Sequence, residues 1–359
     1  MGGFTVVGWD APAYLHCDDL TNPKCEDFKM TRPVHKPSRR AAIKAGLAAG
    51  AGLAISNRLE LFAEEVARQQ ELPLVTTVIP RTGERIPPVG LGTNRYSVNA
   101  PADIENLCNV LKTLTDRDGS VVDTARGYGR AEEVIGGCMT ENGNRDEIFL
   151  VTKYTESNGR RRGSGGAPVD HMAQIELAFE RLQTDMVDVM LVHEVGDAAN
   201  LLPMLQELKA TGRFRYVGVS TSSDRDYRDM APFLSRGELD FLQVDYSIGN
   251  RSAEERMLPL ALEQGTAVVC NLPFGGRRNS VLSEMGDAPL PGYAAEVDCT
   301  SWAQLYLKYL VSHPAVTAVI PGTTKVEHAI DNNGATRGRM PDAPMRARIE
   351  STYAEIAGV

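Results

Sequence analysis

Residues 121–136 read VVDTARGYGRAEEVIG, a short apolar strand followed by a glycine-flanked loop and then a stretch of helical spacing. The strand ends in Asp123, and the loop presents Tyr128. In parallel α/β folds the reactive groups lie at the carboxyl ends of the strands. An acid and a phenol in that place predict a reaction centre in a parallel α/β protein.

Two further polar residues follow apolar runs in the same way. Lys153 ends a run that begins at Ile148, and His193 follows a run that ends at Val192. Because the carboxyl ends of parallel strands meet at one edge, we expect these two side chains to lie near Asp123 and the tyrosine loop.

Strand-length apolar runs alternate with helical patterns through most of the chain. The expected strands are 89–93, 121–123, 148–152, 187–192, 216–220, 241–246, 267–271 and 316–320. The expected helices are 103–114, 131–139, 171–181, 201–210, 224–234, 254–263, 301–312 and 326–335. This alternation predicts an α/β fold of the (β/α)8 TIM-barrel type. An amino-terminal hairpin of 75–79 and 84–86 and an extra carboxyl-terminal helix, 343–356, complete it.

The motif in residues 123–136, Asp-Thr-Ala-x-x-Tyr-Gly with Glu and Ile-Gly after it, resembles the signature of the aldo-keto reductases. Residues 149–153 resemble that family's lysine strand, and residues 185–193 resemble its histidine strand. The resemblance extends from Gly90 to Ala335. It implies an NAD(P)H-dependent oxidoreductase whose barrel is plugged at the bottom by the hairpin.

Reduction of a carbonyl by hydride needs an acid that protonates the forming alkoxide. A tyrosine hydroxyl, with a pKa of ~10, is too weak an acid unless a neighbouring ammonium lowers that pKa. We therefore expect Tyr128 to be the proton donor and acceptor, Lys153 to tune it, and Asp123 to keep the lysine charged. His193 is expected to orient the carbonyl or relay a proton. This chemistry requires no metal.

The resemblance also implies a dinucleotide site. At its nicotinamide end, Thr221 stands where the family usually has Asn, and Asn271 stands where it often has a stacking Tyr. The residues expected to contact this half are Gly92, Thr93, Ser220, Thr221, Gln243, Asn271, Pro273 and Gly275.

At the adenosine-phosphate end, Gly322 and His328 occupy positions that are often Lys and Arg in relatives selective for the 2′-phosphate. The residues expected here are Gly322, Thr323, Lys325, His328, Asp331 and Asn332, and Arg277 or Arg278 could add charge. NADP(H) is favoured as the cofactor, and NAD(H) is left open. Both long loops, 155–169 and 275–299, follow strands, and the second is expected to contact cofactor or substrate.

The amino terminus predicts export. Arg39 and Arg40 precede residues 45–55, which contain only Ala, Gly, Leu and Ile and resemble a twin-arginine (Tat) signal. That run is far shorter than the ~20 residues that span a bilayer. We expect a periplasmic or otherwise exported protein that meets the Tat machinery, with Met30 as an alternative start and Ala54 or Ala63 as possible cleavage points.

The expected segments are a disordered leader over 1–37, the signal region over 38–63, a linker over 64–73 and the barrel over 74–359. The formal net charge of −9 argues against broad nucleic-acid binding. Cys108 and Cys138 fall in helical patterns and are expected to be buried apolar residues, with no disulfide framework.

The substrate is expected to be a small carbonyl compound or alcohol, with no code for its identity in the loops. Two other functions stay open for this chain. One is a sugar or polyol dehydrogenase that keeps its cofactor bound, and the other is a non-catalytic nucleotide-sensing protein on the same fold.

Overall fold

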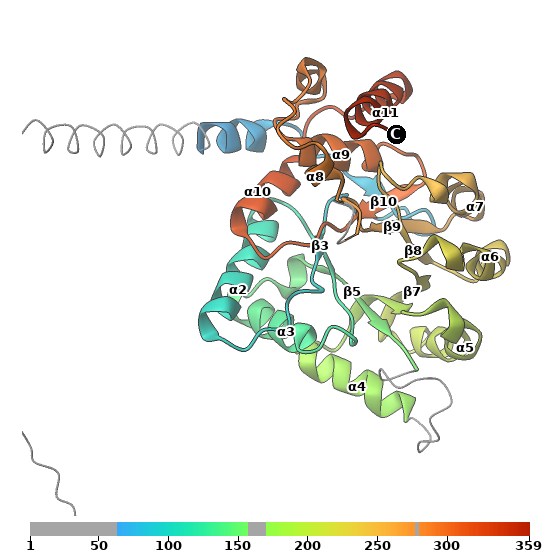
Figure 1. The fold of residues 1–359 in the computed structure, drawn as a ribbon. Coiled ribbons are helices and arrows are strands. Elements are labelled where there is room, and N and C mark those ends of the chain that lie inside the picture. The colour runs from blue at the N-terminus through green and yellow to red at the C-terminus, as the bar shows by residue number, and fades with distance from the viewer. Residues whose placement is uncertain (1–62, 157–169, 277–279) are drawn as a thin grey trace, which may run out of the picture. The chain divides into compact units, whose positions relative to one another are not determined.

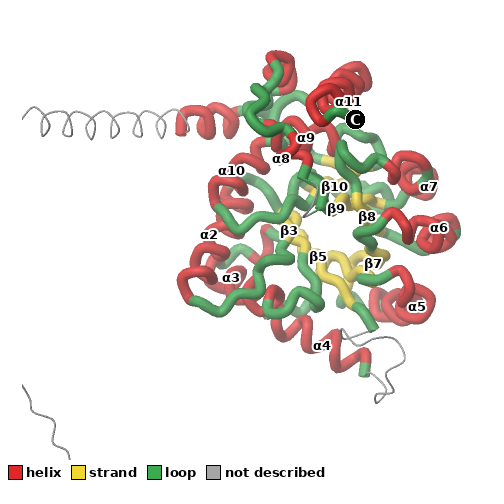
Figure 2. Tube along the Cα trace, viewed as in Figure 1, coloured by secondary structure: helices red, strands yellow, loops and turns green. Residues whose placement is uncertain are grey.

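The computed structural model describes residues 63–156, 170–276 and 280–359. Eight parallel strands form one sheet in which each strand pairs with its neighbours in the chain. The strands are β3 (Leu91–Gly92), β4 (Val121–Asp123), β5 (Phe149–Tyr154), β6 (Val187–Val192), β7 (Phe214–Ser220), β8 (Phe241–Asp245), β9 (Ala267–Asn271) and β10 (Val316–Val319). Figures 1 and 2 show the strands at the centre with the helices around them.

The first and last strands of the sheet also meet. Val89 bridges Val319 and Gly92 bridges Gly322, both in parallel, and the Gly90 amide donates to the Val319 carbonyl at 2.8 Å. These contacts close the sheet, and the predicted (β/α)8 barrel is confirmed.

Helices follow the strands as the sequence pattern predicts. They are α2 (Pro101–Asp116), α3 (Ala131–Asn142), α4 (His171–Leu182), α5 (Ala198–Lys209), α6 (Tyr227–Ser235), α7 (Met257–Gln264), α8 (Val281–Glu284), α9 (Trp302–Val311), α10 (Val326–Gly334) and α11 (Ala343–Ala357). The short helix α8 and a 3-10 helix, Gly292–Val297, lie inside the expected loop 275–299. Such short elements do not complete enough turns to give a periodic signal.

The barrel interior is filled by apolar side chains from alternate positions of the strands. The hairpin of β1 (Thr77–Val78) and β2 (Arg85–Ile86) precedes the barrel, and Ile79 and Ile86 are buried in the same cluster. The Thr77 hydroxyl donates to the Thr317 carbonyl at 2.6 Å, at the start of β10. The hairpin therefore closes the end of the barrel opposite to the carboxyl ends of the strands.

A disulfide joins Cys108 of α2 to Cys138 of α3. The expectation that both residues are buried is confirmed, but the expectation of no disulfide was wrong. The two residues are 30 positions apart, and their Cα atoms come within 4.8 Å only because α2 and α3 pack side by side. The spacing of the two cysteines in the sequence does not reveal that the two helices pack together.

Residues 63–71 are helical, and the segment after them docks on the barrel. Gln69 is buried and its side-chain amide donates to the Gln304 side chain at 3.0 Å, and the Arg337 guanidinium donates to the Leu72 carbonyl at 3.1 Å. The expected linker 64–73 thus contains a helix and makes tertiary contacts. The leader, most of the signal region, Arg277 and Arg278 lie outside the described residues.

No helix within the described ranges is both long enough and apolar enough to span a membrane.

Candidate active site

On several strands the inward-facing residues are apolar until the carboxyl end, where a polar residue follows. Successive inward-facing residues of a strand are two positions apart. The pairs are Val121 and Asp123 on β4, Val151 and Lys153 on β5, Phe241 and Gln243 on β8, and Val269 and Asn271 on β9. Leu191 at the end of β6 is followed two positions on by His193. The same alternation that builds the apolar core thus places a polar layer above it.

Asp123 and Lys153 form an ion pair inside the barrel. The Lys153 Nζ lies 2.6 Å from Asp123 Oδ1 and donates to the Thr124 carbonyl at 2.8 Å. Gln243 Nε2 donates to the second carboxylate oxygen, Asp123 Oδ2, at 2.7 Å. Asp123 and Lys153 are each only 2% exposed. Every oxygen of the carboxylate therefore has a partner, which a buried charge requires.

The tyrosine and the histidine lie over this pair. Lys153 Nζ is 5.3 Å from the centre of the Tyr128 ring. The Tyr128 and His193 rings meet edge to face, with centres 5.6 Å apart and planes at 80°. The structure thus brings together Asp123, Tyr128, Lys153 and His193, called the tetrad below.

Burial sets the direction of the pKa shift for Tyr128 and His193, whereas neighbouring groups set it for Lys153. Burial raises the pKa of Tyr128, although the adjacent Lys153 ammonium acts in the opposite direction as the sequence reasoning expects. Burial alone would depress the pKa of Lys153, but Asp123 and Tyr128 together raise it. Burial, helped by the Lys153 charge, lowers the pKa of His193 to about 4. At neutral pH the lysine is therefore charged and the histidine neutral.

The residues expected at the nicotinamide end line the same polar layer. Ser220 Oγ donates to Gln243 Oε1 at 3.1 Å, and Asn271 Nδ2 donates to the Thr221 carbonyl at 2.8 Å. Asn271 Oδ1 is buried and accepts no hydrogen bond within the described part of the chain. An unmatched acceptor here fits a ligand that brings an N–H donor, such as the carboxamide of a nicotinamide ring. Thr221 donates its hydroxyl to Asp226 at 2.7 Å.

Other residues expected at this end shape the backbone. A Cβ on Gly92 would lie 2.8 Å from the Ile320 carbonyl oxygen, so close strand contact already requires this glycine. Thr93 is buried and donates its hydroxyl to the Asp123 carbonyl at 2.8 Å. Pro273 lies in a tight turn after β9, where the Gly275 amide donates to the Leu272 carbonyl at 2.7 Å. Gly275 has φ +80°, which a glycine adopts readily.

The residues expected at the adenosine end follow β10. Lys325 has a side chain 60% exposed and lies 3.9 Å from Glu327, and His328 is exposed on the first turn of α10. Asp331 accepts hydrogen bonds from Ser301 at 2.9 Å and Gln304 at 2.8 Å, so its oxygens are already engaged. The remaining expected residues are the exposed Gly322 and the buried Thr323 and Asn332.

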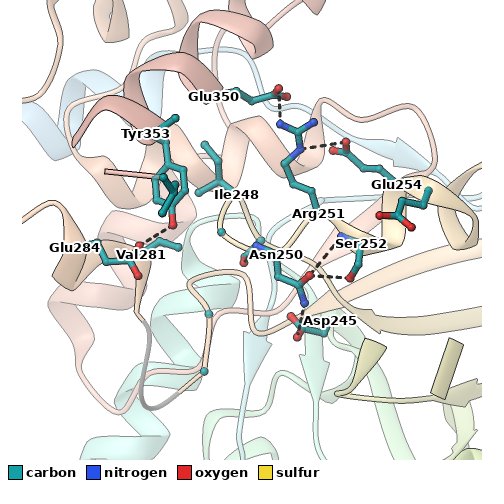
Figure 3. A pocket seen from close by; sticks show the side chains of 17 residues that line it. Asp245, Ile248, Asn250, Arg251, Ser252, Glu254, Val281, Glu284, Glu350 and Tyr353 are labelled. Carbon is teal, nitrogen blue, oxygen red and sulfur yellow. Dashed lines mark hydrogen bonds and ion pairs between the residues drawn. The ribbon is translucent and has the colours of Figure 1, made fainter. Parts of the chain in front are cut away.

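A pocket of about 920 Å³ lies between the loops after β8 and β9 and the helix α11 (Figure 3). Asp245, Glu284 and Glu350 line it together with Arg251, and Gly275 reaches its wall. Its lining includes no tetrad residue. Among the described residues of its walls carboxylates outnumber cations, and this balance disfavours the phosphates of a dinucleotide.

The sequence predicts no role for two features of the site. The Thr124 carbonyl that holds Lys153 is a backbone group, and no side-chain pattern reveals it. Glu132 is fully buried behind the tyrosine loop. The only sequence feature that could indicate this burial is the position of an acidic residue next to the apolar face of a predicted helix.

Comparison with known proteins gives consistent matches. A model of the aldo/keto reductase family matches residues 88–351. The methylglyoxal reductase YeaE of Escherichia coli is 27% identical over 275 residues, which cover 75% of this chain and 91% of that protein. An NADH-specific methylglyoxal reductase of the same organism is 25% identical over 268 residues, covering 62% of this chain and 80% of that protein.

The barrel also matches solved structures. An aldo/keto reductase from Klebsiella pneumoniae, in complex with NADP and acetate, is 25% identical and superposes with a TM-score of 0.61. The match covers 78% of this chain and 96% of that one.

Proposed function

The chain belongs to the aldo/keto reductase family of oxidoreductases, and we propose that it interconverts a carbonyl and an alcohol with NADP(H), using Tyr128 as acid and base. The observation that carries the proposal is the buried Lys153–Asp123 pair beneath the Tyr128 ring. It places a fixed positive charge next to a phenol at the carboxyl ends of the strands, where such folds carry their reactions.

Tyr128, Lys153 and Asp123 have different roles in the proton transfer. NADPH, when bound, supplies the hydride that reduces the carbonyl carbon. Tyr128 gives its hydroxyl proton to the carbonyl oxygen as negative charge develops there, and the Lys153 ammonium stabilises the phenolate that remains. Asp123 balances the charge of the lysine and holds it in place through the 2.6 Å contact.

His193 orients the substrate in this proposal. Its pKa of about 4 leaves the ring neutral near pH 7, with one N–H to donate. A neutral donor can bind the carbonyl oxygen beside Tyr128 without competing as an acid.

NADP(H) is the favoured cofactor, and NAD(H) is possible. The Klebsiella relative is described with NADP, whereas one Escherichia coli relative is described as NADH-specific. Asn271 Oδ1 is the acceptor that would meet the nicotinamide carboxamide. Within the described residues, Lys325 supplies a positive charge for a 2′-phosphate at the adenosine end, and the exposed His328 lies close to it in the chain.

We also propose export through the twin-arginine route, read from Arg39 and Arg40. The Cys108–Cys138 disulfide supports this, because disulfides persist in oxidising compartments such as the periplasm and are rare in the cytosol. The buried contacts of Gln69 indicate that cleavage leaves this residue in the mature chain. Cleavage at Ala54 or at Ala63 meets that condition.

The test is to purify the mature protein, identify any nucleotide that copurifies, and follow oxidation of NADPH and NADH with a carbonyl panel. Methylglyoxal is the first compound to try, since two relatives are described as methylglyoxal reductases. Carbonyl-dependent oxidation of NADPH is the expected result. A tightly held nucleotide with turnover only on sugars or polyols would favour the dehydrogenase alternative, and no turnover at all would favour the nucleotide-sensing one.

A further inference from the structure

A fully buried carboxylate lies behind the tyrosine loop. Glu132 is the second residue of α3 and is 0% exposed. Its Oε1 accepts a hydrogen bond of 2.8 Å from the hydroxyl of Thr152 on β5. Thr152 directly precedes Lys153 in the strand, and Glu132 follows Tyr128 by four residues.

Hydrogen bonds join the loop that carries Tyr128 to β5 both before and after the tyrosine. Before the tyrosine, the Arg126 amide donates to the Lys153 carbonyl at 3.3 Å. After it, the Glu132 side chain is held by Thr152. Between these two points the Ala131 amide donates to the Tyr128 carbonyl at 3.3 Å, so the chain turns tightly between Tyr128 and Glu132.

We propose that Glu132 is a positioning residue, whose bond to Thr152 fixes the distance between Tyr128 and Lys153. The inference rests on the proposed function, because it assigns Glu132 a part in the same proton transfer. Glu132 itself contacts neither the substrate nor the reacting atoms in this account.

The surroundings of Glu132 are not those of an ordinary structural ion pair. The closest cation is Arg181 of α4, with Nη1 3.8 Å from Oε2, and Oε2 accepts no hydrogen bond within the described ranges. A half-paired buried carboxylate costs stability, and an apolar side chain of similar size would avoid that cost. A specific bond to the strand of the lysine gives a reason for a carboxyl group here.

The hydrogen bond from Thr152 to Glu132 does not require Glu132 to be charged. Burial raises its pKa to about 7, although Thr152 and the cations Arg181 and Arg126 act in the opposite direction. The protonated and ionised forms can both accept from the Thr152 hydroxyl. Glutamine keeps that acceptor, so Glu132→Gln is the conservative variant and Glu132→Ala removes the bond.

The experiment measures kcat, KM and the NADPH dissociation constant for Glu132→Ala, Glu132→Gln and Thr152→Val. Displacement of a catalytic group by about 1 Å can lower a rate about 100-fold, so we expect kcat of the alanine and valine variants to fall about 10- to 100-fold. The NADPH dissociation constant should stay near the wild-type value, and Glu132→Gln should restore most of kcat.

Glu133→Ala is the matched control. This neighbour lies on the same turn of α3, but its side chain is 40% exposed and pairs on the surface with Arg130 at 2.8 Å. Its loss should leave kcat unchanged.

A second readout separates positioning from general destabilisation. If Glu132 acts through Tyr128, adding Glu132→Ala to Tyr128→Phe should produce little further loss of the residual rate. A structural defect would lower the rate by a similar factor in both backgrounds, and that result would overturn the inference.

The outcomes also separate the inference from the function on which it rests. If Tyr128→Phe abolishes turnover while Glu132→Ala and Thr152→Val keep wild-type kcat, the positioning role is wrong and the proposed function stands. If Tyr128→Phe itself keeps normal turnover, both are wrong. If Glu132→Ala fails to fold, Thr152→Val and Glu132→Gln still test the positioning role. A normal kcat in Thr152→Val contradicts that role. A loss of kcat in Glu132→Gln as large as the loss in Thr152→Val also contradicts it.

Discussion

At the scale of single residues, this site depends on what burial does to titratable groups. Lys153 keeps its charge because Asp123 is 2.6 Å away, whereas burial and the Lys153 charge lower the pKa of His193, which is therefore neutral. The same layer therefore holds one fixed cation and one neutral ring, the combination that the proposed carbonyl reduction by Tyr128 needs.

The low pKa of His193 predicts a loss of stability in acid. The pKa is about 4 in the folded protein and about 6.5 in the unfolded chain, so the unfolded chain binds the proton first as pH falls. The contribution of His193 is thus complete above pH ~6.5 and is lost as pH falls towards ~4. We expect a loss of about 2 kcal/mol by pH 5 that His193→Gln does not show.

Urea denaturation of the wild type and His193→Gln at pH 7.5 and pH 5 measures this difference. Equal losses in the two proteins on acidification would show that His193 is not held neutral in the folded state.

Cofactor choice also belongs to the residue scale. If Lys325 contacts the 2′-phosphate, Lys325→Met should weaken NADPH binding by about 1.5–3 kcal/mol and barely change NADH binding. Lys112→Met, which removes an exposed lysine of α2 paired to Asp116, is the control. Titration of both dinucleotides against each variant gives the answer. Loss of NADPH affinity in Arg277 or Arg278 variants instead would move the contact to the loop after β9.

At the scale of elements, the sequence predicts the barrel well because its strands are buried apolar runs with a fixed order. Each predicted strand is present, and the ends of β4, β6 and β9 agree with the prediction. The tetrad could be predicted since period-2 alternation places Asp123 and Lys153 on the inner face. The hydrogen bond of Glu132 to Thr152 and the Cys108–Cys138 bond could not, because they depend on how α3 packs on β5 and on α2.

The disulfide between α2 and α3 should stabilise the barrel next to the tyrosine loop. For a separation of 30 residues, the chain-entropy relation gives about 3–4 kcal/mol. We expect Cys108→Ala with Cys138→Ala to unfold at lower temperature than the oxidised wild type. Thermal unfolding with and without reductant measures this, and the double variant should not respond to reductant. A wild type whose unfolding temperature is unchanged by full reduction would contradict the stabilising role.

At the scale of the whole molecule, we expect the proposed export signal and the barrel to act independently of each other. Changing Arg39 and Arg40 together to lysine should keep the protein in the cytoplasm while the barrel still folds and binds nucleotide. Cell fractionation with a nucleotide-binding assay on the retained protein measures both. Normal export of this double variant would exclude the twin-arginine route.

The central claim is that this barrel reduces a carbonyl with Tyr128 as its acid, and Tyr128→Phe tests it most directly. The variant keeps the ring next to Lys153 and His193 and removes only the hydroxyl. The measurement is kcat for carbonyl reduction beside the NADPH dissociation constant, in wild type and variant. The account predicts a fall in kcat of about 10²- to 10⁴-fold with NADPH binding nearly unchanged. A variant that reduces the carbonyl at close to the wild-type rate would contradict it.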